Sequence, residues 1–83
     1  MHDLVAVEKI IRVAERIILD LPAKPKFIKL NLLYGAIGGV EPKHFEEHFR
    51  EKTKGTILEN VELSFKEDII PYRDVNLESI EVE

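Results

Sequence analysis

The first two residues of this sequence, Met1 and His2, carry groups that can bind a metal ion. A chain that begins with a residue followed by histidine offers its α-amine, the histidine amide nitrogen and the imidazole. These nitrogen atoms close fused chelate rings around one ion, and Ni(II) and Cu(II) favour such donors in tetragonal geometry. The fourth position stays open for another ligand. We expect Met1 to be retained, because the large residue at position 2 disfavours its removal. The alternative is a frayed terminus with a chance histidine.

A second candidate is the segment His44-Phe45-Glu46-Glu47-His48, whose two histidines are spaced i and i+4. On a helix these side chains share a face and together could hold a zinc ion. The metalloprotease pattern requires a glutamate directly after the first histidine, and this chain has Phe45 there. No third ligand is evident from the sequence, so a solvated helix face is the favoured interpretation and metal hydrolysis a distant alternative.

The glycines at positions 35, 38 and 39 form a third candidate, a loop that could cradle a phosphate. The loop lacks the Gly-Lys-Ser/Thr ending of a P-loop, and its spacing does not fit the dinucleotide fingerprint. Tight turning is the simpler purpose for these glycines. Serine and threonine are scattered and cysteine is absent, so no pair of nucleophile and base is recognisable. We therefore expect that the chain is not an enzyme.

Hydrophobic periodicity predicts two helices that would position these groups. The first covers residues 3–21, with apolar side chains at helical spacing on one side and Asp3 as the N-cap. The second covers residues 42–53, where Pro42 suits the first turn and Gly55 suits the C-terminal end. The apolar stripe of this second helix is thin and consists of Phe45 and Phe49.

Alternation of apolar and polar residues predicts three strands. The first covers residues 26–34, the second begins at Val61 and the third lies within residues 75–83. In the third strand the apolar positions change parity at Glu78–Ser79, which indicates a bulge or a bend. Leu33 interrupts the alternation of the first strand, and an exposed Leu33 beside a thin second helix favours weak self-association into a homo-oligomer. The predicted fold is α+β, with two helices packed on a small three-stranded sheet in the order α-β-α-β-β.

Composition excludes several classes of partner and site. The chain has 12 basic and 16 acidic residues, a net charge of −4 and no basic cluster, so we expect no nucleic-acid partner. The longest mainly apolar run, "LLYGAIGGV", is short and broken by glycine, so we expect no contact with a membrane. Charges throughout the N-terminal segment exclude a secretory signal, which predicts a cytoplasmic location. The absence of cysteine removes disulfides, iron–sulfur clusters and thiolate zinc sites.

Three blocks of the sequence resemble the HypA/HybF family, the nickel-insertion proteins of hydrogenase maturation. The blocks are "MHDL" at the start, "YGAIGGVEPKHFEEHF" in the middle and "KGTILENVELSF" after it. Members typically begin Met-His-Glu and carry a Gly-x-x-x-Gly-Val-x-Pro loop that is followed by Lys-Gly-Thr-Ile. The resemblance covers nearly the whole chain, and the order and spacing of the blocks match. It favours a nickel site at Met1–His2 over a frayed terminus.

The sequence departs from the family in two places. The family inserts a zinc-ribbon domain with two Cys-x-x-Cys pairs after the second strand and then completes the sheet with a segment ending much like "SIEVE". In this chain a short link near residues 67–74 takes the place of that domain, so we expect no zinc and interpret residues 1–83 as a single HypA-like nickel-binding domain. Such a link is topologically simple if the second and third strands are neighbours that pair antiparallel. The second departure is Asp3, which is one methylene shorter than the family's glutamate.

The resemblance implies a nickel-binding metallochaperone or accessory protein in the maturation of [NiFe]-hydrogenase or another nickel enzyme. Ni(II) would be its cargo, and the implied nickel site comprises Met1, His2 and Asp3, with His44 and His48 as additional metal candidates. The implied partners are a HypB-like GTPase and the hydrogenase large subunit or another nickel enzyme. Loss of the zinc domain leaves an alternative open, in which the chain is a metal-independent adaptor or regulatory paralogue that binds the maturation partners.

Overall fold

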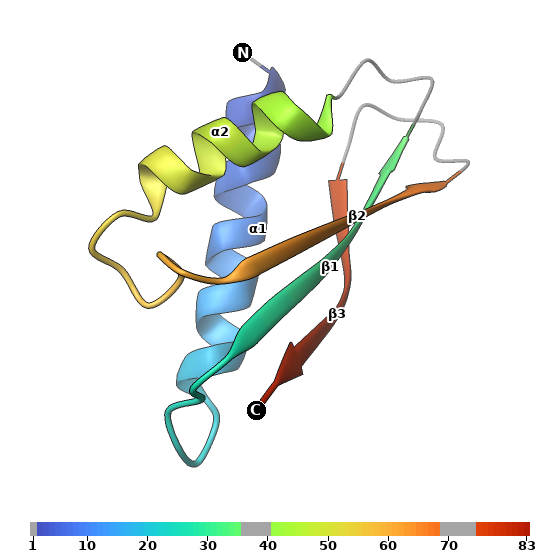
Figure 1. Cartoon of the computed structure of the whole chain (residues 1–83). Coiled ribbons are helices and arrows are strands. Elements are labelled where there is room, and N and C mark those ends of the chain that lie inside the picture. Colours follow the sequence, from blue (N-terminus) through green and yellow to red (C-terminus); the bar gives the residue numbers. More distant parts are fainter. Residues whose placement is uncertain (1, 36–40, 69–74) are drawn as a thin grey trace.

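The computed structural model describes residues 2–35, 41–68 and 75–83, with the side chains of residues 2 and 3 outside that description. Two helices cover one face of a three-stranded sheet (Figure 1), so the α+β fold predicted from the sequence is confirmed. The elements are α1 (His2–Leu19), β1 (Ile28–Gly35), α2 (Pro42–Lys52), β2 (Glu62–Asp68) and β3 (Val75–Val82). Within the described ranges, no helix combines the length and the apolar character that crossing a lipid bilayer requires.

The central strand of the sheet is β1, because the strand order is β2-β1-β3. β1 runs parallel to β2, with Leu30 opposite Leu63, and antiparallel to β3, with Leu30 opposite Ile80. α2 forms the crossover that the parallel pair requires. Since β1 separates β2 from β3, the expectation that the second and third strands are neighbours is wrong. β1 takes the central place because Lys29 is its only charged residue, whereas charged residues line both edge strands.

A β-bulge lies in β3 where the sequence predicted it. Asn31 pairs with Ser79 and Leu32 pairs with Leu77, so Glu78 is an extra residue with no partner in β1. The extra residue reverses the alternation of side chains along the strand. Leu77 before the bulge and Ile80 after it therefore both pack against the core. The bulge predicted at Glu78–Ser79 is confirmed.

Helix α1 begins earlier and ends earlier than its periodicity predicted. It covers His2–Leu19, whereas the expected range was 3–21. Asp3 has helical backbone and is not the N-cap, because an N-cap residue keeps a non-helical backbone. The chain leaves the helix before Pro22, since the residue that precedes a proline is biased away from helical backbone.

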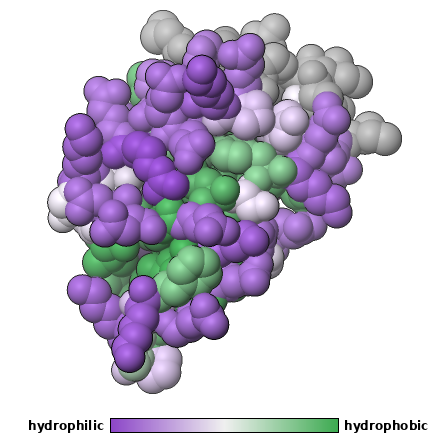
Figure 2. Space-filling model, viewed as in Figure 1, coloured by the Kyte–Doolittle hydropathy of each residue, from purple (hydrophilic) through white to green (hydrophobic). Residues whose placement is uncertain are grey.

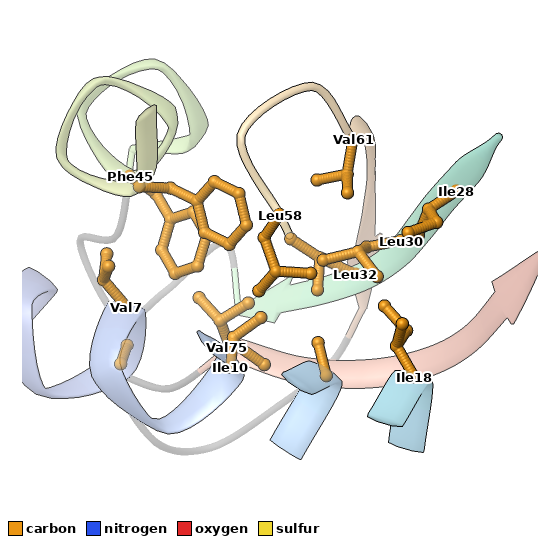
Figure 3. Packing of buried hydrophobic residues seen from close by; sticks show 13 residues of the cluster. Val7, Ile10, Ile18, Ile28, Leu30, Leu32, Phe45, Leu58, Val61 and Val75 are labelled. Atoms are coloured by element: carbon orange, nitrogen blue, oxygen red, sulfur yellow. The ribbon is translucent and has the colours of Figure 1, made fainter. Parts of the chain in front are cut away.

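The core is one cluster between the two helices and the sheet (Figure 3). The aromatic rings of Phe45 and Phe49 lie 6.2 Å apart, and Phe45 meets the ring of Phe65 edge to face at 5.7 Å. The thin apolar stripe predicted for α2 is therefore the surface that packs this helix against the sheet. The buried members are Ala6, Val7, Ile10, Ala14, Ile18, Ile28, Leu30, Leu32, Phe45, Phe49, Leu58, Val61 and Val75.

The start and end of α2 follow the sequence prediction. Pro42 lies in the first turn of the helix, where a missing backbone N–H costs no hydrogen bond. The helix ends at Lys52, and in the turn that follows Gly55 has a φ of +79°, a left-handed conformation that glycine adopts without strain. The C-cap itself is Thr53, so Gly55 serves the turn after the helix rather than its cap.

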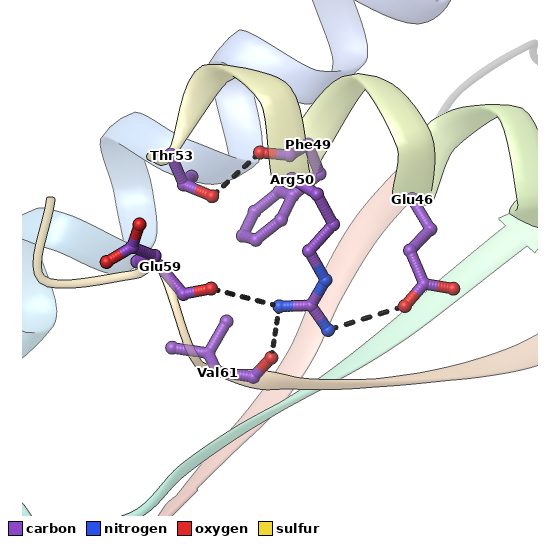
Figure 4. A network of polar contacts seen from close by, with 6 residues as sticks. All are labelled: Glu46, Phe49, Arg50, Thr53, Glu59 and Val61. Atoms are coloured by element: carbon purple, nitrogen blue, oxygen red, sulfur yellow. Dashed lines mark hydrogen bonds and ion pairs between the residues drawn. The ribbon is translucent and has the colours of Figure 1, made fainter. Parts of the chain in front are cut away.

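Arg50 holds the segment between α2 and β2 (Figure 4). Its guanidinium donates hydrogen bonds to the carbonyl oxygens of Val61 and Glu59 and forms an ion pair with Glu46 at 3.3 Å. Nearby, the fully buried Thr53 donates its hydroxyl proton to the carbonyl oxygen of Phe49 at 2.8 Å. This role of Arg50 was not predicted from the sequence, although the i, i+4 spacing of Glu46 and Arg50 is a signal for such a pair.

Candidate metal centre

The start of α1 lies at the same end of the molecule as the start of β3 (Figure 1). β2 ends at Asp68 opposite Gly35 of β1, and β3 begins at Val75 on the other side of β1. The ammonium of Lys9 donates a hydrogen bond to the side-chain oxygen of Asn76 at 3.4 Å. This contact places the first half of α1 beside the first residues of β3.

The first turns of α1 are held mainly by burial. Ala6, Val7 and Ile10 lie in the core, with at most 4% of their surface exposed. An ion pair between Glu8 and Lys52 at 3.5 Å joins α1 to the end of α2, but both side chains are about half exposed. Exposed pairs of this kind contribute little to stability. The packed side chains therefore fix the helix that carries the candidate nickel donors.

His2 is the first residue of α1, and this position determines whether its amide nitrogen is hydrogen-bonded within the helix. The first N–H groups of a helix have no acceptor within the helix, so the amide nitrogen of His2 is not engaged in the helical ladder. The positive end of the helix dipole disfavours a bare cation, but it favours a negatively charged ligand group. A deprotonated amide nitrogen brings such a charge to the metal. Met1 lies outside the described residues, as do the side chains of His2 and Asp3.

His44 and His48 lie one turn apart on α2, as their spacing predicted. His44 is exposed, and its Nδ1 lies 3.2 Å from a carboxylate oxygen of Glu41, whereas His48 is half-buried. In the part of the chain that the structure describes, no three His, Asp or Glu side chains gather where they could hold a metal ion. These two histidines therefore have no third ligand among the described residues. This favours a solvated helix face over a zinc site as the interpretation of the segment.

The glycine loop is described only at its first residue. Gly35 is the buried last residue of β1 and pairs with Asp68 of β2. It ends a strand, which agrees with the turning role that the sequence favoured. Gly38 and Gly39, the other two glycines of the suggested phosphate cradle, lie outside the described residues.

Two adjoining cavities lie at the end of the molecule opposite to the start of α1. One, of about 290 Å³, lies beside the end of α1, and the other, of about 250 Å³, lies between the start of β1 and the segment before β2. Figure 2 shows hydrophobic side chains in the middle and lower left of one face of the molecule, framed by hydrophilic ones. The cavity walls contain no histidine and no carboxylate, so these cavities offer no metal ligands. The walls share Lys24, Pro25, Ile28 and Ile57.

Comparison of the chain with protein-family models, with curated proteins and with solved structures finds no match in any of the three. The relation to the HypA/HybF family therefore stays a resemblance of sequence blocks. The candidate centre consists of the Met1–His2 pair of the sequence and the start of α1, which the structure places at a defined end of the fold.

Proposed function

We propose that this chain is a nickel-binding accessory protein of the HypA type, located in the cytoplasm. It holds Ni(II) as cargo at its N-terminus for transfer to a nickel enzyme. The donors are the α-amine of Met1, the amide nitrogen of His2 and the imidazole of His2. The observation that supports this donor set is the start of α1 at His2, because a helix leaves the amide of its first residue without an internal acceptor.

Each of the three donors must be free of its proton before it can bind the metal, so nickel binding releases protons. The helix dipole assists this step at the amide, since it stabilises the negative charge that remains on nitrogen. The resemblance includes Asp3 in the same nickel site, where its carboxylate would add a further negative charge. These charges together offset the repulsion between Ni(II) and the positive end of the helix.

Transfer requires that the ion is held by an incomplete ligand set. The three nitrogen donors leave one tetragonal position open, and a group from the receiving protein can occupy it. The resemblance supplies the partners for this step, a HypB-like GTPase and a hydrogenase large subunit or another nickel enzyme. We propose that they meet the ion at the end of the fold where α1 starts.

Ni(II) titration of the protein with an unextended N-terminus tests this proposal. Three altered forms are compared with it: His2→Ala, a form whose α-amine is acetylated, and His44→Ala as the matched control. We expect His2→Ala and the acetylated form to lose most of the affinity, because each removes a donor. The control should bind as the native protein does. Equal affinity in all four forms would contradict the proposal.

The same variants distinguish the metal-independent adaptor. If the chain is an adaptor, His2→Ala captures a HypB-like GTPase or a hydrogenase subunit as strongly as the native protein does, with or without Ni(II). If the chain is a nickel carrier, capture of the nickel enzyme subunit depends on the bound ion and on His2. Zinc binding that survived His2→Ala and disappeared with His44→Ala would instead favour a site on α2.

A further inference from the structure

β3 forms an edge of the sheet, and no other strand of the described chain lies on its outer side. A strand at a sheet edge presents a row of unpaired backbone N–H and C=O groups that can pair with another strand. The side chains from Leu77 to Val82 are exposed or half-buried. The opposite edge differs, because the outer strand there, β2, carries Lys66 beside Glu67 and Asp68. Lysine in particular protects an edge from pairing, and β3 has none, although its bulge at Glu78 interrupts regular pairing there.

The side of α1 that carries Lys9 also carries exposed apolar side chains. Val13 and Ile17 are 41% and 44% exposed, and they continue the row at i+4 and i+8 from Lys9, whose ammonium reaches β3. α1 and β3 run in the same direction (Figure 1). Eight helical residues cover about 12 Å, which is also the span of about four strand residues, so Ile17 lies roughly level with Ile80. Val13, Ile17, Ile80 and Val82, the last of which is 42% exposed, form the apolar side of this edge.

The other side of the same edge is acidic. β3 contains Glu78 and Glu81 and no basic residue. Glu81 accepts a hydrogen bond from the amide group of Asn31 at 2.8 Å, which holds its carboxylate over the helix-free face of the sheet. Lys29 pairs with Glu81 in the strand register, but its ammonium forms an ion pair with Glu62 of β2 at 3.6 Å. The edge is therefore apolar toward α1 and negatively charged on the helix-free face.

We propose that the edge of β3 is a docking site for an extended segment of a partner protein in which apolar residues alternate with lysine or arginine. The segment adds as a fourth strand and pairs its backbone with β3. Successive side chains of a strand point to opposite faces, so the apolar ones cover Val13 and Ile17 while the basic ones face Glu78 and Glu81. A second copy of β3 fits poorly, because pairing it with itself brings like charges together. This inference does not depend on nickel binding.

The test uses a synthetic peptide that alternates valine and lysine and has the 8 residues of β3. Binding to the whole protein is followed by backbone amide shifts in NMR titrations. We expect the largest shifts along β3 and at Val13 and Ile17, and small shifts along β2. The same peptide with alternate backbone nitrogens methylated cannot pair as a strand, and its affinity should fall about tenfold or more. A peptide with glutamate in place of lysine should not bind detectably.

Two pairs of protein variants separate strand addition from non-specific attraction to an acidic protein. Ile17→Ser should weaken binding of the valine–lysine peptide several-fold, while Val5→Ser, on the same helix and 73% exposed, should not. Glu81→Gln keeps an acceptor for Asn31 and should weaken binding, whereas Glu51→Gln on α2 should not. Equal binding of the methylated peptide, or shifts centred on β2, would overturn the proposal. So would a dimer in solution whose interface protects the β3 amides, because it assigns the edge to a second copy.

Discussion

The ammonium of Lys9 lies 3.4 Å from the side-chain oxygen of Asn76, so a contact across 67 positions of the sequence ties the first half of α1 to the start of β3. The contact shows which part of α1 lies beside β3, while the buried side chains of Ala6, Val7 and Ile10 hold the helix in place. Its first residue, His2, carries the proposed nickel donors at one end. Further along the same helix, Val13 and Ile17 border the free edge of β3.

Phe45 is the side chain on which the packing of α2 depends most directly. It is fully buried and contacts the rings of both Phe49 and Phe65. We expect Phe45→Ala to lower the free energy of unfolding by about 3–5 kcal/mol, because the truncation leaves a cavity. Val5→Ala, at an exposed position of α1, should change it by less than about 0.5 kcal/mol. Urea unfolding measures both, and equal effects would contradict the packing described for α2.

Arg50 connects α2 to the carbonyl oxygens that precede β2. We expect Arg50→Met to lower the free energy of unfolding by about 1–2 kcal/mol, because the part-buried carbonyl oxygen of Val61 and the exposed one of Glu59 lose a charged donor while the apolar stem is kept. Amide hydrogen exchange should accelerate mainly between Thr53 and Val61. Lys54→Met is the matched control, since Lys54 is exposed. Unchanged exchange in this segment of Arg50→Met would show that the hydrogen bonds of Arg50 do not hold it.

The bulge in β3 predicts which single-residue deletions the strand tolerates. Deletion of Glu78 leaves the apolar residues Val75, Leu77, Ile80 and Val82 in strict alternation, so the shortened strand can keep all four on the core side. We expect the deletion to change the free energy of unfolding by no more than about 1 kcal/mol. Deletion of Glu81 should be more harmful, because it turns Val82 toward the helix-free face. If thermal unfolding ranked the two deletions in the opposite order, the register would be wrong.

Acidification should weaken nickel binding. Protons compete with Ni(II) for the amine of Met1 and for the imidazole and amide nitrogen of His2, so the affinity rises with pH and falls as pH decreases. Between about pH 8 and about pH 6 we expect a loss of tenfold or more, measured by competition with a chelator of known affinity. His44→Ala should show the same dependence. An affinity that did not vary with pH would exclude these donors.

Local patterns in the sequence predicted much of this fold. The alternation of Ile28, Leu30 and Leu32 identified β1, and the change of parity in the last segment identified the bulge at Glu78. Pro42 identified the start of α2. These features succeed because each depends on neighbours within a few residues, where the period of the backbone decides which side chains are buried.

Features that depend on distant partners were predicted less well. The short link after β2 suggested a hairpin with β3, but β1 lies between the two strands because it is the least charged of the three. Periodicity places a side chain on a face without naming its partner, so the ties made by Arg50 and Lys9 were not foreseen. The prediction that Asp3 is the N-cap was wrong, because the helix already begins at His2. Packing of Ala6 and Val7 in the core supports this first turn.

The central claim is that the backbone nitrogen of His2 binds nickel, and its ¹⁵N resonance reports this directly. Carbon-detected NMR of the labelled protein, with and without one equivalent of Ni(II), follows this nitrogen whether or not it keeps its proton. We predict that the His2 nitrogen resonance shifts or broadens first and most, and that acetylation of the α-amine of Met1 abolishes the effect. A His2 nitrogen that is unchanged at saturating Ni(II), with the largest changes at His44 and His48, would contradict the claim.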